Sequence, residues 1–411
     1  MNRGLYSASF AGSLGGFVFG YDLGMLSSTT QSLRGQFHLS PAAFGITISC
    51  SLWGTVCGAV LAGRVADRIG RRALIAGCAI LYALAAVAVT LPLDSDWGLL
   101  LTSRFFCGAA IGGFTVGCPL YLSELAPIAF RGGLVSLFQV QVGVGVVTAF
   151  SAASSLGHLI SAASIWKWCL GSGTIPAVVL LLLLGLMPPE PPRFAKPGSA
   201  LPSQKGSQPA KLFRRRNTRL IMLATSVAVF NQLSGVNIVL LYVLDILSSA
   251  GIGFAMGHTY TILISCLSLA TTLLGMAFVD KSGRKRLLLL GAAGMAVCLL
   301  GLGLSIPRNL PPIVYLSILV GYNAFFAFSQ GTVVWVYLSE LFPSGIRGAG
   351  QGYGSSVHWI MNAILVSVFP IMQHASSVRI FYFLAVMMVA QIAVVWYWYP
   401  ETRATSLGSF A

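Results

Sequence analysis

Four polar side chains interrupt an apolar stretch of the sequence at residues 229–242. They are Asn231, Gln232, Ser234 and Asn237, and the run around them is apolar enough to span a lipid bilayer. Because hydrocarbon holds no water, an unpaired amide at that depth is costly. We therefore expect these side chains to face protein, a cavity or a ligand.

Further polar and aromatic residues lie within other apolar segments. Trp335 is too deep in its segment to belong to an interfacial aromatic belt. Trp359 and Asn362 share one helical face at a spacing of three. Gln139 and Gln141 are two residues apart, so at most one of them faces a central cavity. Each residue alone is more often used for packing than for binding.

Taken together, these amides and aromatic rings suit one class of ligand. Amides form paired hydrogen bonds with vicinal hydroxyls, and flat rings stack on C–H faces. A neutral polyhydroxylated molecule offers both features, whereas an anionic ligand requires Arg or Lys in the cavity. The sequence therefore predicts a site for a neutral polyhydroxylated ligand.

Asp22 and Arg104 are charged residues within apolar segments. Asp22 ends the motif Phe19-Gly-Tyr-Asp22, and Arg104 is the only basic residue within the apolar length of any segment. An intramembrane charge is expensive and usually functional; the alternative is a charge neutralised by a structural partner. Asp22 is the only acidic candidate near the depth of Arg104 in the first half of the chain, so we hypothesise a buried pair between them.

The composition identifies a membrane protein that must position these groups. The chain has 411 residues, of which 56% are hydrophobic and 9% charged. Twelve apolar segments are each about long enough to cross a bilayer as a helix. They lie near residues 8–28, 42–63, 73–93, 97–121, 132–156, 166–187, 219–247, 257–279, 287–306, 311–338, 348–372 and 377–399.

The net charge of +15 comes from basic residues that lie mostly on one side of the membrane. They are not gathered into a nucleic-acid-binding patch. If Met1 is inside the cell, twenty basic residues fall on the even loops and termini and four on the odd loops. The positive-inside rule then predicts that both termini are cytoplasmic. The basic side is expected to lie against anionic lipid of the inner leaflet, and no nucleic-acid partner is expected.

Targeting and cofactor signals are not evident. The first apolar segment has no cleavage site before the next one, so we expect it to remain as the first helix. All eight cysteines lie within apolar segments, without a CxxC spacing or a neighbouring histidine cluster. We interpret them as packing residues and expect no metal and no cofactor. No nucleophile–base pairing is evident either, so an enzyme is not expected.

Two motifs each occur twice. The motif Asp-x-x-Gly-Arg-basic begins at Asp67 and again at Asp280, 213 residues later. The motif Leu-Ser-Glu-Leu-x-Pro has its glutamate at Glu124 and again at Glu340, 216 residues later. Two signatures at nearly one offset indicate a tandem duplication. Because six segments separate the copies, the two halves share one orientation and pack as parallel repeats, with a midplane site between them.

The duplication predicts an all-α membrane protein with twelve transmembrane helices in two six-helix halves. We expect an N-terminal half at 1–187 and a C-terminal half at 219–411. Residues 188–218, rich in Pro, Gly, Ser and basic residues, are expected to form a cytoplasmic linker.

These motifs together resemble the sugar porter family of the major facilitator superfamily, which includes facilitative glucose transporters and bacterial sugar–proton symporters. The resemblance covers nearly the whole chain. The residues that carry it are Phe19 to Asp22, Gly63 to Arg72, Pro119 to Pro127, Gln232-Leu-Ser-Gly-Val-Asn237, Asp280 to Arg286, Trp335 with Leu338-Ser-Glu340, and Pro400-Glu-Thr402.

The resemblance implies roles for three sets of residues. It implies sugar binding by Phe19, Gln139, Asn231, Gln232, Asn237, Trp335, Trp359 and Asn362. It implies proton coupling through Asp22 with its partner Arg104. It implies a cytoplasmic gating network, which favours the outward-open state, of Asp67, Arg71, Glu124, Arg131, Asp280, Arg284, Glu340 and Arg347.

Several positions depart from the family pattern. Asn231 stands where relatives usually have the longer Gln, and Ser268 stands where they often have Asn. Leu241 replaces one of two tandem aromatic residues, and Ser329-Gln-Gly-Thr332 replaces a Gly-Pro-rich hinge. We expect these changes to affect the choice of sugar and the gating.

The expected function is secondary transport of a neutral monosaccharide by alternating access, with proton symport through Asp22. The alternatives are a passive uniporter of the same fold, a drug or organic-ion transporter, and a sugar receptor that does not transport. The receptor is disfavoured because only eleven residues follow Pro400. The expected protein is a monomer in the plasma membrane or bacterial inner membrane.

Overall fold

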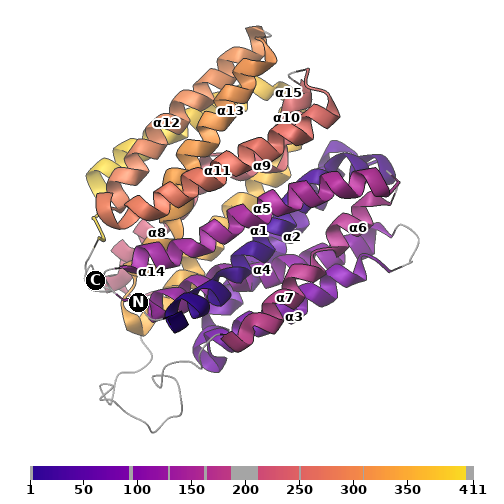
Figure 1. Cartoon of the computed structure of the whole chain (residues 1–411). Coiled ribbons are helices and arrows are strands. Elements are labelled where there is room, and N and C mark those ends of the chain that lie inside the picture. The colour runs from indigo at the N-terminus through magenta and orange to yellow at the C-terminus, as the bar shows by residue number, and fades with distance from the viewer. Residues whose placement is uncertain are drawn as a thin grey trace.

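The computed structural model describes residues 3–91, 96–127, 130–161, 164–186, 212–249, 251–308 and 310–403, and is shown in Figure 1. Within these ranges it contains helices and turns and no strand. Most of the predicted linker at 188–218 lies outside the described residues; its last part includes a 3-10 turn at Arg215–Asn217 that leads into the next helix.

The helices before the linker are α1 (Arg3–Phe37), α2 (Pro41–Ile69), α3 (Arg71–Ala88), α4 (Trp97–Leu125), α5 (Arg131–Leu159), α6 (Ile165–Gly171) and α7 (Thr174–Leu183). The helices after it are α8 (Thr218–Leu233), α9 (Val236–Leu241), α10 (Val243–Ser249), α11 (Phe254–Ser282), α12 (Arg284–Ser305), α13 (Pro312–Phe326), α14 (Thr332–Leu341) and α15 (Arg347–Trp398).

These elements make the fold of a multi-pass membrane protein. Among the described residues, eleven helical spans are long and apolar enough to cross a membrane. In that count α6 with α7 forms one span, α8 with α9 another, and α13 with α14 a third. The 35-residue α1, whose hydropathy is diluted by polar residues, packs along α5 and completes the predicted twelve.

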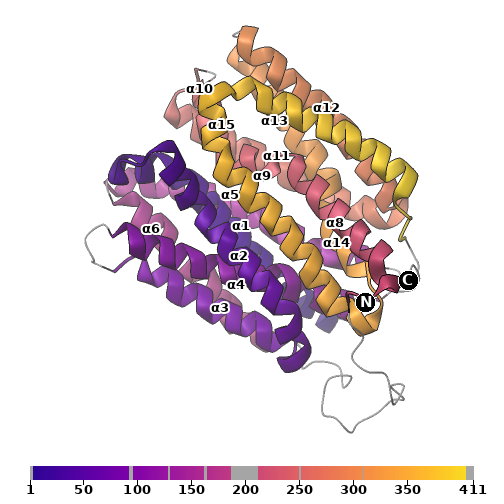
Figure 2. The ribbon, with the colours of Figure 1, turned by 180° about the vertical axis from the view of Figure 1, so that it is seen from behind.

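The last two predicted segments differ from the structure at their junction. A break was expected between residues 372 and 377, but α15 continues as a single 52-residue helical element from Arg347 to Trp398. Figure 2 shows that it bends sharply, so that its two limbs run in opposite directions and diverge from the bend. Each limb supplies one membrane span, at Arg347–Met372 and Val378–Trp398.

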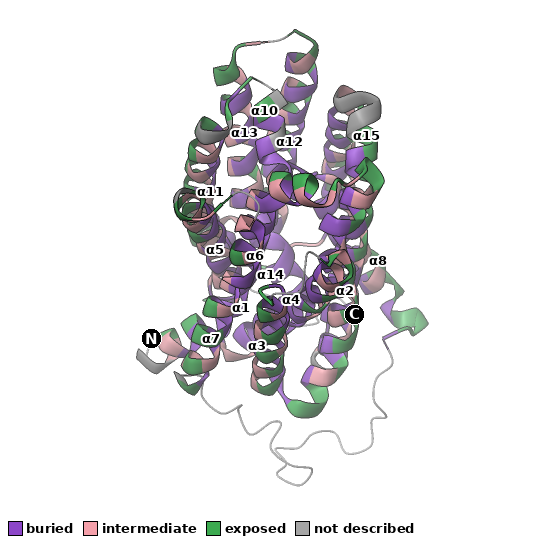
Figure 3. Ribbon diagram, turned by 90° about the vertical axis from the view of Figure 1, so that its right-hand side faces the viewer, coloured by how far each residue is buried: buried purple, intermediate pink, exposed green. Residues whose placement is uncertain are grey.

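The two sets of helices lie side by side along the bundle (Figures 1 and 2). They meet where α2 packs on α15 and where α5 packs on α11. The end of the bundle that carries the Asp67 and Asp280 motifs is called the basic end below, and the other is called the opposite end. Figure 3 shows buried residues between the helices and exposed ones around the outside. Large apolar side chains such as Leu159, Leu182 and Tyr397 are on that outer surface, as expected for a surface that faces lipid.

Glycines allow α1 to lie directly against α5. A side chain at Gly16 would meet the carbonyl oxygen of Phe138, and one at Gly20 would meet the carbonyl oxygen of Val142. Backbones that approach this closely gain van der Waals contact, which drives helix association in lipid. The polar residues of α1 are thereby held in a fixed position relative to α5.

The stretch at 229–242 is not one continuous helix. Ser234 ends α8, and Gly235 adopts a left-handed conformation with φ of 83° before α9 begins. The backbone carbonyl that the break releases, that of Ser234, accepts a hydrogen bond of 2.8 Å from the Tyr322 hydroxyl. The break therefore occurs among the polar residues and places them on two short helices instead of one.

Candidate functional site

Three amides and one imidazole form a connected cluster in the interior of the bundle. Gln232 is 1% exposed and is at its centre. Its amide oxygen accepts from Asn237 at 3.0 Å, and its amide nitrogen donates to Asn231 at 3.2 Å. The same nitrogen lies 2.7 Å from Nε2 of His358. Because an amide nitrogen only donates, this ring nitrogen of His358 is the acceptor.

Aromatic rings from both halves surround this cluster. Trp335 and Trp359 lie with their ring centroids 6.5 Å apart. Phe19 packs edge-on against Trp359 at 5.3 Å, and Phe138 against Trp335 at 5.8 Å. The indole nitrogen of Trp359 donates to Thr115 on α4 at 3.2 Å. The helices that supply these groups are α1, α4, α5, α14 and α15, so the site is at the interface between the halves.

His358 was not among the residues predicted from the sequence. Its ring centroid is 5.0 Å from that of Trp335 and 4.9 Å from that of Trp359, and the side chain is 4% exposed. A sequence signal was present: His358 precedes Trp359 directly and is four residues before Asn362, on the same helical face. The structure adds it to the site as the acceptor that orients Gln232.

Two other predicted residues lie apart from this hydrogen-bonded cluster. Asn362 is 1% exposed, and neither atom of its amide has a partner among the described residues. Gln139 is half-buried on α5 and faces the other half: a side chain at Gly331 would lie 3.5 Å from its amide nitrogen. Its neighbour Gln141 is buried at 8% exposure.

Asp22 and Arg104 form a buried ion pair with two hydrogen bonds. Both terminal guanidinium nitrogens of Arg104 donate to the carboxylate, each at 2.6 Å. Tyr82 donates a third hydrogen bond of 2.7 Å to the same carboxylate. Arg104 is 2% exposed and Asp22 5%. Each charge therefore depends on the other, because neither is in contact with water.

The duplicated motifs form two ion-pair clusters of the same design. In each, the arginine of the Asp-x-x-Gly-Arg motif bridges its own aspartate and the glutamate of the Leu-Ser-Glu motif. The distances are 2.9 Å for Arg71–Asp67, 3.2 Å for Arg71–Glu124, 3.0 Å for Arg284–Asp280 and 2.7 Å for Arg284–Glu340. Each cluster lies within one half and fixes the helices of that half at the basic end.

The aspartates also reach across to the other half. The Asp280 carboxylate accepts a hydrogen bond of 2.8 Å from the backbone nitrogen of Gly133, at the start of α5. In the matching place, a side chain at Gly348 would lie 2.7 Å from the Asp67 carboxylate, at the start of α15. A carboxylate at a helix N-terminus is favoured by the unpaired backbone N–H groups there. Arg131 and Arg347 begin these two helices, and Arg347 donates to the Phe342 carbonyl at 3.4 Å.

The motif Pro400-Glu-Thr402 completes the second cluster. The Glu401 carboxylate accepts hydrogen bonds from the backbone nitrogens of Arg284 at 2.9 Å and Lys285 at 3.1 Å, which caps the start of α12. The Thr402 hydroxyl donates to the Glu340 carboxylate at 2.8 Å. Glu401 and Thr402 are therefore part of the charged network.

An Asp280→Asn variant should loosen the basic end. The substitution removes the charge that binds Arg284 and the Gly133 amide. A hydrogen bond to a charged group contributes about 1.5–3 kcal/mol, and the 27% exposure of the Asp280 side chain reduces this. We expect about five- to tenfold faster hydrogen exchange of the first amides of α5, measured by mass spectrometry. Asp96→Asn, which changes a capping carboxylate of α4 outside the two clusters, is the control and should leave that rate unchanged.

The two halves also touch at the opposite end. The Ser27 hydroxyl of α1 is within hydrogen-bonding distance of the carbonyl oxygens of Leu240 and Leu241, at 3.0 and 3.1 Å. The ring of Tyr242 lies 6.2 Å from that of Phe44 on α2 and 4.7 Å from that of Phe369 on α15. Contacts between the halves are therefore present on both sides of the amide cluster.

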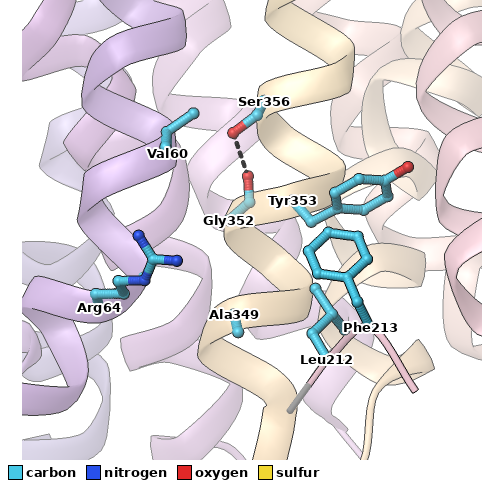
Figure 4. Close-up of a pocket in the computed structure, with 9 residues that line it drawn as sticks. Val60, Arg64, Leu212, Phe213, Ala349, Gly352, Tyr353 and Ser356 are labelled. Atoms are coloured by element: carbon cyan, nitrogen blue, oxygen red, sulfur yellow. Dashed lines mark hydrogen bonds between the residues drawn. The ribbon is translucent and has the colours of Figure 1, made fainter. Parts of the chain in front are cut away.

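A pocket of about 470 Å³ lies away from this cluster (Figure 4). It is bounded by α2 and α15 and by Leu212 and Phe213, at the basic end. Its lining is mostly apolar with Arg64 at the edge, and it contains none of the amides or tryptophans described above. We do not assign the ligand site to this pocket, because the groups suited to a polyhydroxylated ligand are elsewhere.

Comparisons with known proteins agree with this architecture. The family model for sugar (and other) transporters matches residues 8–196 and 200–411. A D-xylose transporter of Levilactobacillus brevis is 32% identical over 88% of this chain and 85% of its own length. The glucose transporter GlcP of Staphylococcus epidermidis is 30% identical over 99% of this chain and 96% of its own.

A solved structure shows the same fold. The proton:xylose symporter XylE, bound to 6-bromo-6-deoxy-D-glucose, superposes with a TM-score of 0.85 at 27% identity. The match covers 98% of each chain. The resemblance inferred from the motifs is thus confirmed, as is the all-α fold with two parallel repeats. The chain belongs to the sugar (and other) transporter family and is a multi-pass membrane transporter of the major facilitator superfamily rather than an enzyme.

Proposed function

We propose that this protein carries a neutral monosaccharide, a glucose-like hexose or a xylose-like pentose, across the membrane by alternating access, coupled to a proton through Asp22. The observation that carries the proposal is the cluster of Gln232, Asn237 and His358 beside Trp335 and Trp359. It offers neutral donors, neutral acceptors and aromatic faces at the interface of the halves. The named substrates of the relatives, xylose and glucose, are molecules of this class.

Proton coupling is supported by the arrangement of α1. Asp22 and Phe19 are three residues apart and so lie on one face of that helix. Asp22 holds α1 to Arg104 on α4, while Phe19 packs on Trp359 of the other half. Protonation of Asp22 removes its charge and weakens its pair with Arg104. A shift of α1 that follows would move Phe19 at the sugar site, so that proton and sugar cross together.

The gating proposal rests on the two clusters at the basic end. The Asp280 carboxylate binds across the halves, so separation of the halves at that end must break its hydrogen bond from Gly133. We assign the basic end to the cytoplasm of the plasma membrane or bacterial inner membrane, with both termini there. The halves are 1–187 and 219–411, with a cytoplasmic linker at 188–218. The protein acts as a monomer whose basic end lies against anionic lipid, without a metal, cofactor or nucleic acid.

A substrate panel in proteoliposomes tests the function. Purified protein should take up radiolabelled D-xylose or D-glucose, and unlabelled sugars should compete where organic cations do not. An inward-directed proton gradient should drive accumulation above the external concentration. Inhibition by cations but not by sugars would contradict the sugar assignment.

A passive uniporter is the second candidate. The bidentate pair between Asp22 and Arg104 favours it, because a buried ion pair with two hydrogen bonds can serve only to hold α1 to α4. This candidate predicts sugar exchange and counterflow with no accumulation in response to the proton gradient. The same proteoliposomes, with and without the gradient, separate the two candidates.

A further inference from the structure

Polar residues follow one face of α15 from its start to the sugar site. They are Gln351, Ser355, His358 and Asn362, at successive spacings of four, three and four. Residues at these spacings lie one above another on a helix. With a rise of about 1.5 Å per residue, the row extends roughly 16 Å from Gln351 near the basic end to Asn362. His358 belongs to the central cluster. Gln351 and Ser355 do not, so that cluster does not explain their role.

Gln351 and Ser355 are buried without hydrogen-bond partners. Both are 0% exposed. Among the residues that the structure describes, neither the amide oxygen nor the amide nitrogen of Gln351 has a partner, and the Ser355 hydroxyl has none. Other serines of the same helix are satisfied by their own backbone: Ser356 donates to the Gly352 carbonyl at 2.6 Å, as Figure 4 shows, and Ser367 to Ala363 at 2.6 Å. The unpaired state of Ser355 is therefore not a general property of serines on α15.

The neighbours of α15 show which way this face points. On one side, a side chain at Gly350 would meet Phe342, just after α14, and one at Gly354 would meet Leu338 of α14. On another side, a side chain at Gly352 would meet the backbone of α2. Gln351 and Ser355 lie between these two sides, and thus towards the interior where α15 faces the N-terminal half. Ser356 instead lines the peripheral pocket of Figure 4.

We propose that Gln351 and Ser355 form a second, weaker sugar-binding station between the central site and the basic end. This inference rests on the proposed function. Buried polar atoms are hydrogen-bonded in nearly all proteins, so three that lack partners in one helix face require a partner that arrives in another state. The Gln351 amide supplies a donor and an acceptor, and Ser355 supplies a hydroxyl. A monosaccharide that leaves the central site when the basic end opens would exchange its contacts with Gln232 for contacts with these two residues.

Protection of an introduced thiol tests the station. Ser355→Cys replaces the hydroxyl by a group of similar size, and its reaction with a membrane-impermeant maleimide is followed by peptide mass spectrometry, which separates it from the native cysteines. The central site is disabled in the same chain by Gln232→Leu. We expect the transported sugar, D-xylose or D-glucose at high concentration, to slow the reaction about fivefold in this background. Adding Gln351→Leu should remove the protection, whereas the matched control Ser356→Ala should retain it.

The alternatives give different results. If water alone satisfies these residues, sugar gives no protection once Gln232 is replaced, and the station is overturned. Protection that persists with Gln351→Leu also overturns it. If Ser355→Cys does not fold, Gln351→Cys carries the thiol and Ser355→Ala replaces Gln351→Leu as the variant that removes protection. Wild-type uptake of the sugar is measured in parallel. If the wild-type protein takes up sugar but the thiol of the variant is not protected, only the station is contradicted. If the wild-type protein takes up no sugar, the proposed function is contradicted and the station with it.

Discussion

The Asp22→Asn variant is expected to lose proton-driven sugar accumulation while it retains sugar counterflow. Asparagine has nearly the same shape as aspartate and still accepts a hydrogen bond from Arg104, but it does not titrate. The accumulation ratio under an imposed proton gradient should fall to about that of the gradient-free control. Measurement in proteoliposomes with radiolabelled sugar gives both quantities from one preparation.

The same substitution should lower stability. Arg104 is 2% exposed and would keep its charge with no anionic partner. Loss of one member of a buried pair costs about 3–5 kcal/mol, so a lower melting temperature is expected. Tyr82→Phe is the control, because it removes the 2.7 Å hydrogen bond to Asp22 and leaves the ion pair intact. It should cost about 1 kcal/mol and preserve coupling. If Asp22→Asn responds to the proton gradient as the wild type does, Asp22 is not the coupling residue.

The fold was predictable because lipid imposes strict rules. The segments could be counted from apolar length alone, and the halves from the two motif offsets. The contact between Asp22 and Arg104 was predictable for a related reason: a buried charge needs a partner, and the sequence offers one candidate at that depth. The backbone near residue 374 was not predictable in this way. A loop was expected there, but α15 bends while its backbone stays helical.

The hydrogen bonds among the residues of the site were less predictable. Asn231 was expected to bind sugar, and the sequence did not indicate that its amide oxygen accepts a hydrogen bond from Gln232. His358 was missed because a single histidine in an apolar segment is usually a packing residue, and its position beside Trp359 and Asn362 does not reveal its contact with Gln232. Both facts depend on which groups meet across helices far apart in sequence. The break at Gly235, which brings Asn237 to Gln232, is likewise visible only in three dimensions.

One departure from the family pattern coincides with an irregular turn of the backbone. The segment Ser329-Gln-Gly-Thr332, where relatives have a Gly-Pro-rich hinge, overlaps a π-helical turn at Ala327–Gly331 between α13 and α14. Gln330 in this turn donates to Gln391 in the second limb of α15 at 2.7 Å. π-helical turns disturb the regular hydrogen-bond ladder and are sites where helices bend. This stretch therefore has a local backbone irregularity without proline.

A Gln232→Leu variant should lose most of its sugar affinity. Gln232 joins Asn231, Asn237 and His358, so its removal eliminates one donor and one acceptor and leaves three buried groups without a partner. Sites built to bind hydroxyls lose affinity steeply when such a group is absent, and we expect the dissociation constant to rise about 100-fold. Tryptophan fluorescence is a suitable readout, because Trp335 and Trp359 adjoin the cluster. Gln391→Leu, a buried glutamine outside the cluster, is the control and should change the dissociation constant less than about twofold.

A double-mutant cycle then tests whether His358 acts through Gln232. His358→Phe keeps an aromatic ring between Trp335 and Trp359 but removes the acceptor of the 2.7 Å hydrogen bond. Alone, it should raise the dissociation constant about five- to tenfold, as expected for the loss of one oriented hydrogen bond. Combined with Gln232→Leu it should add almost nothing, because residues that act as one unit are not additive. A double variant whose effect equals the product of the two single effects would show that His358 meets the sugar independently, and the orienting role assigned to it here would be wrong.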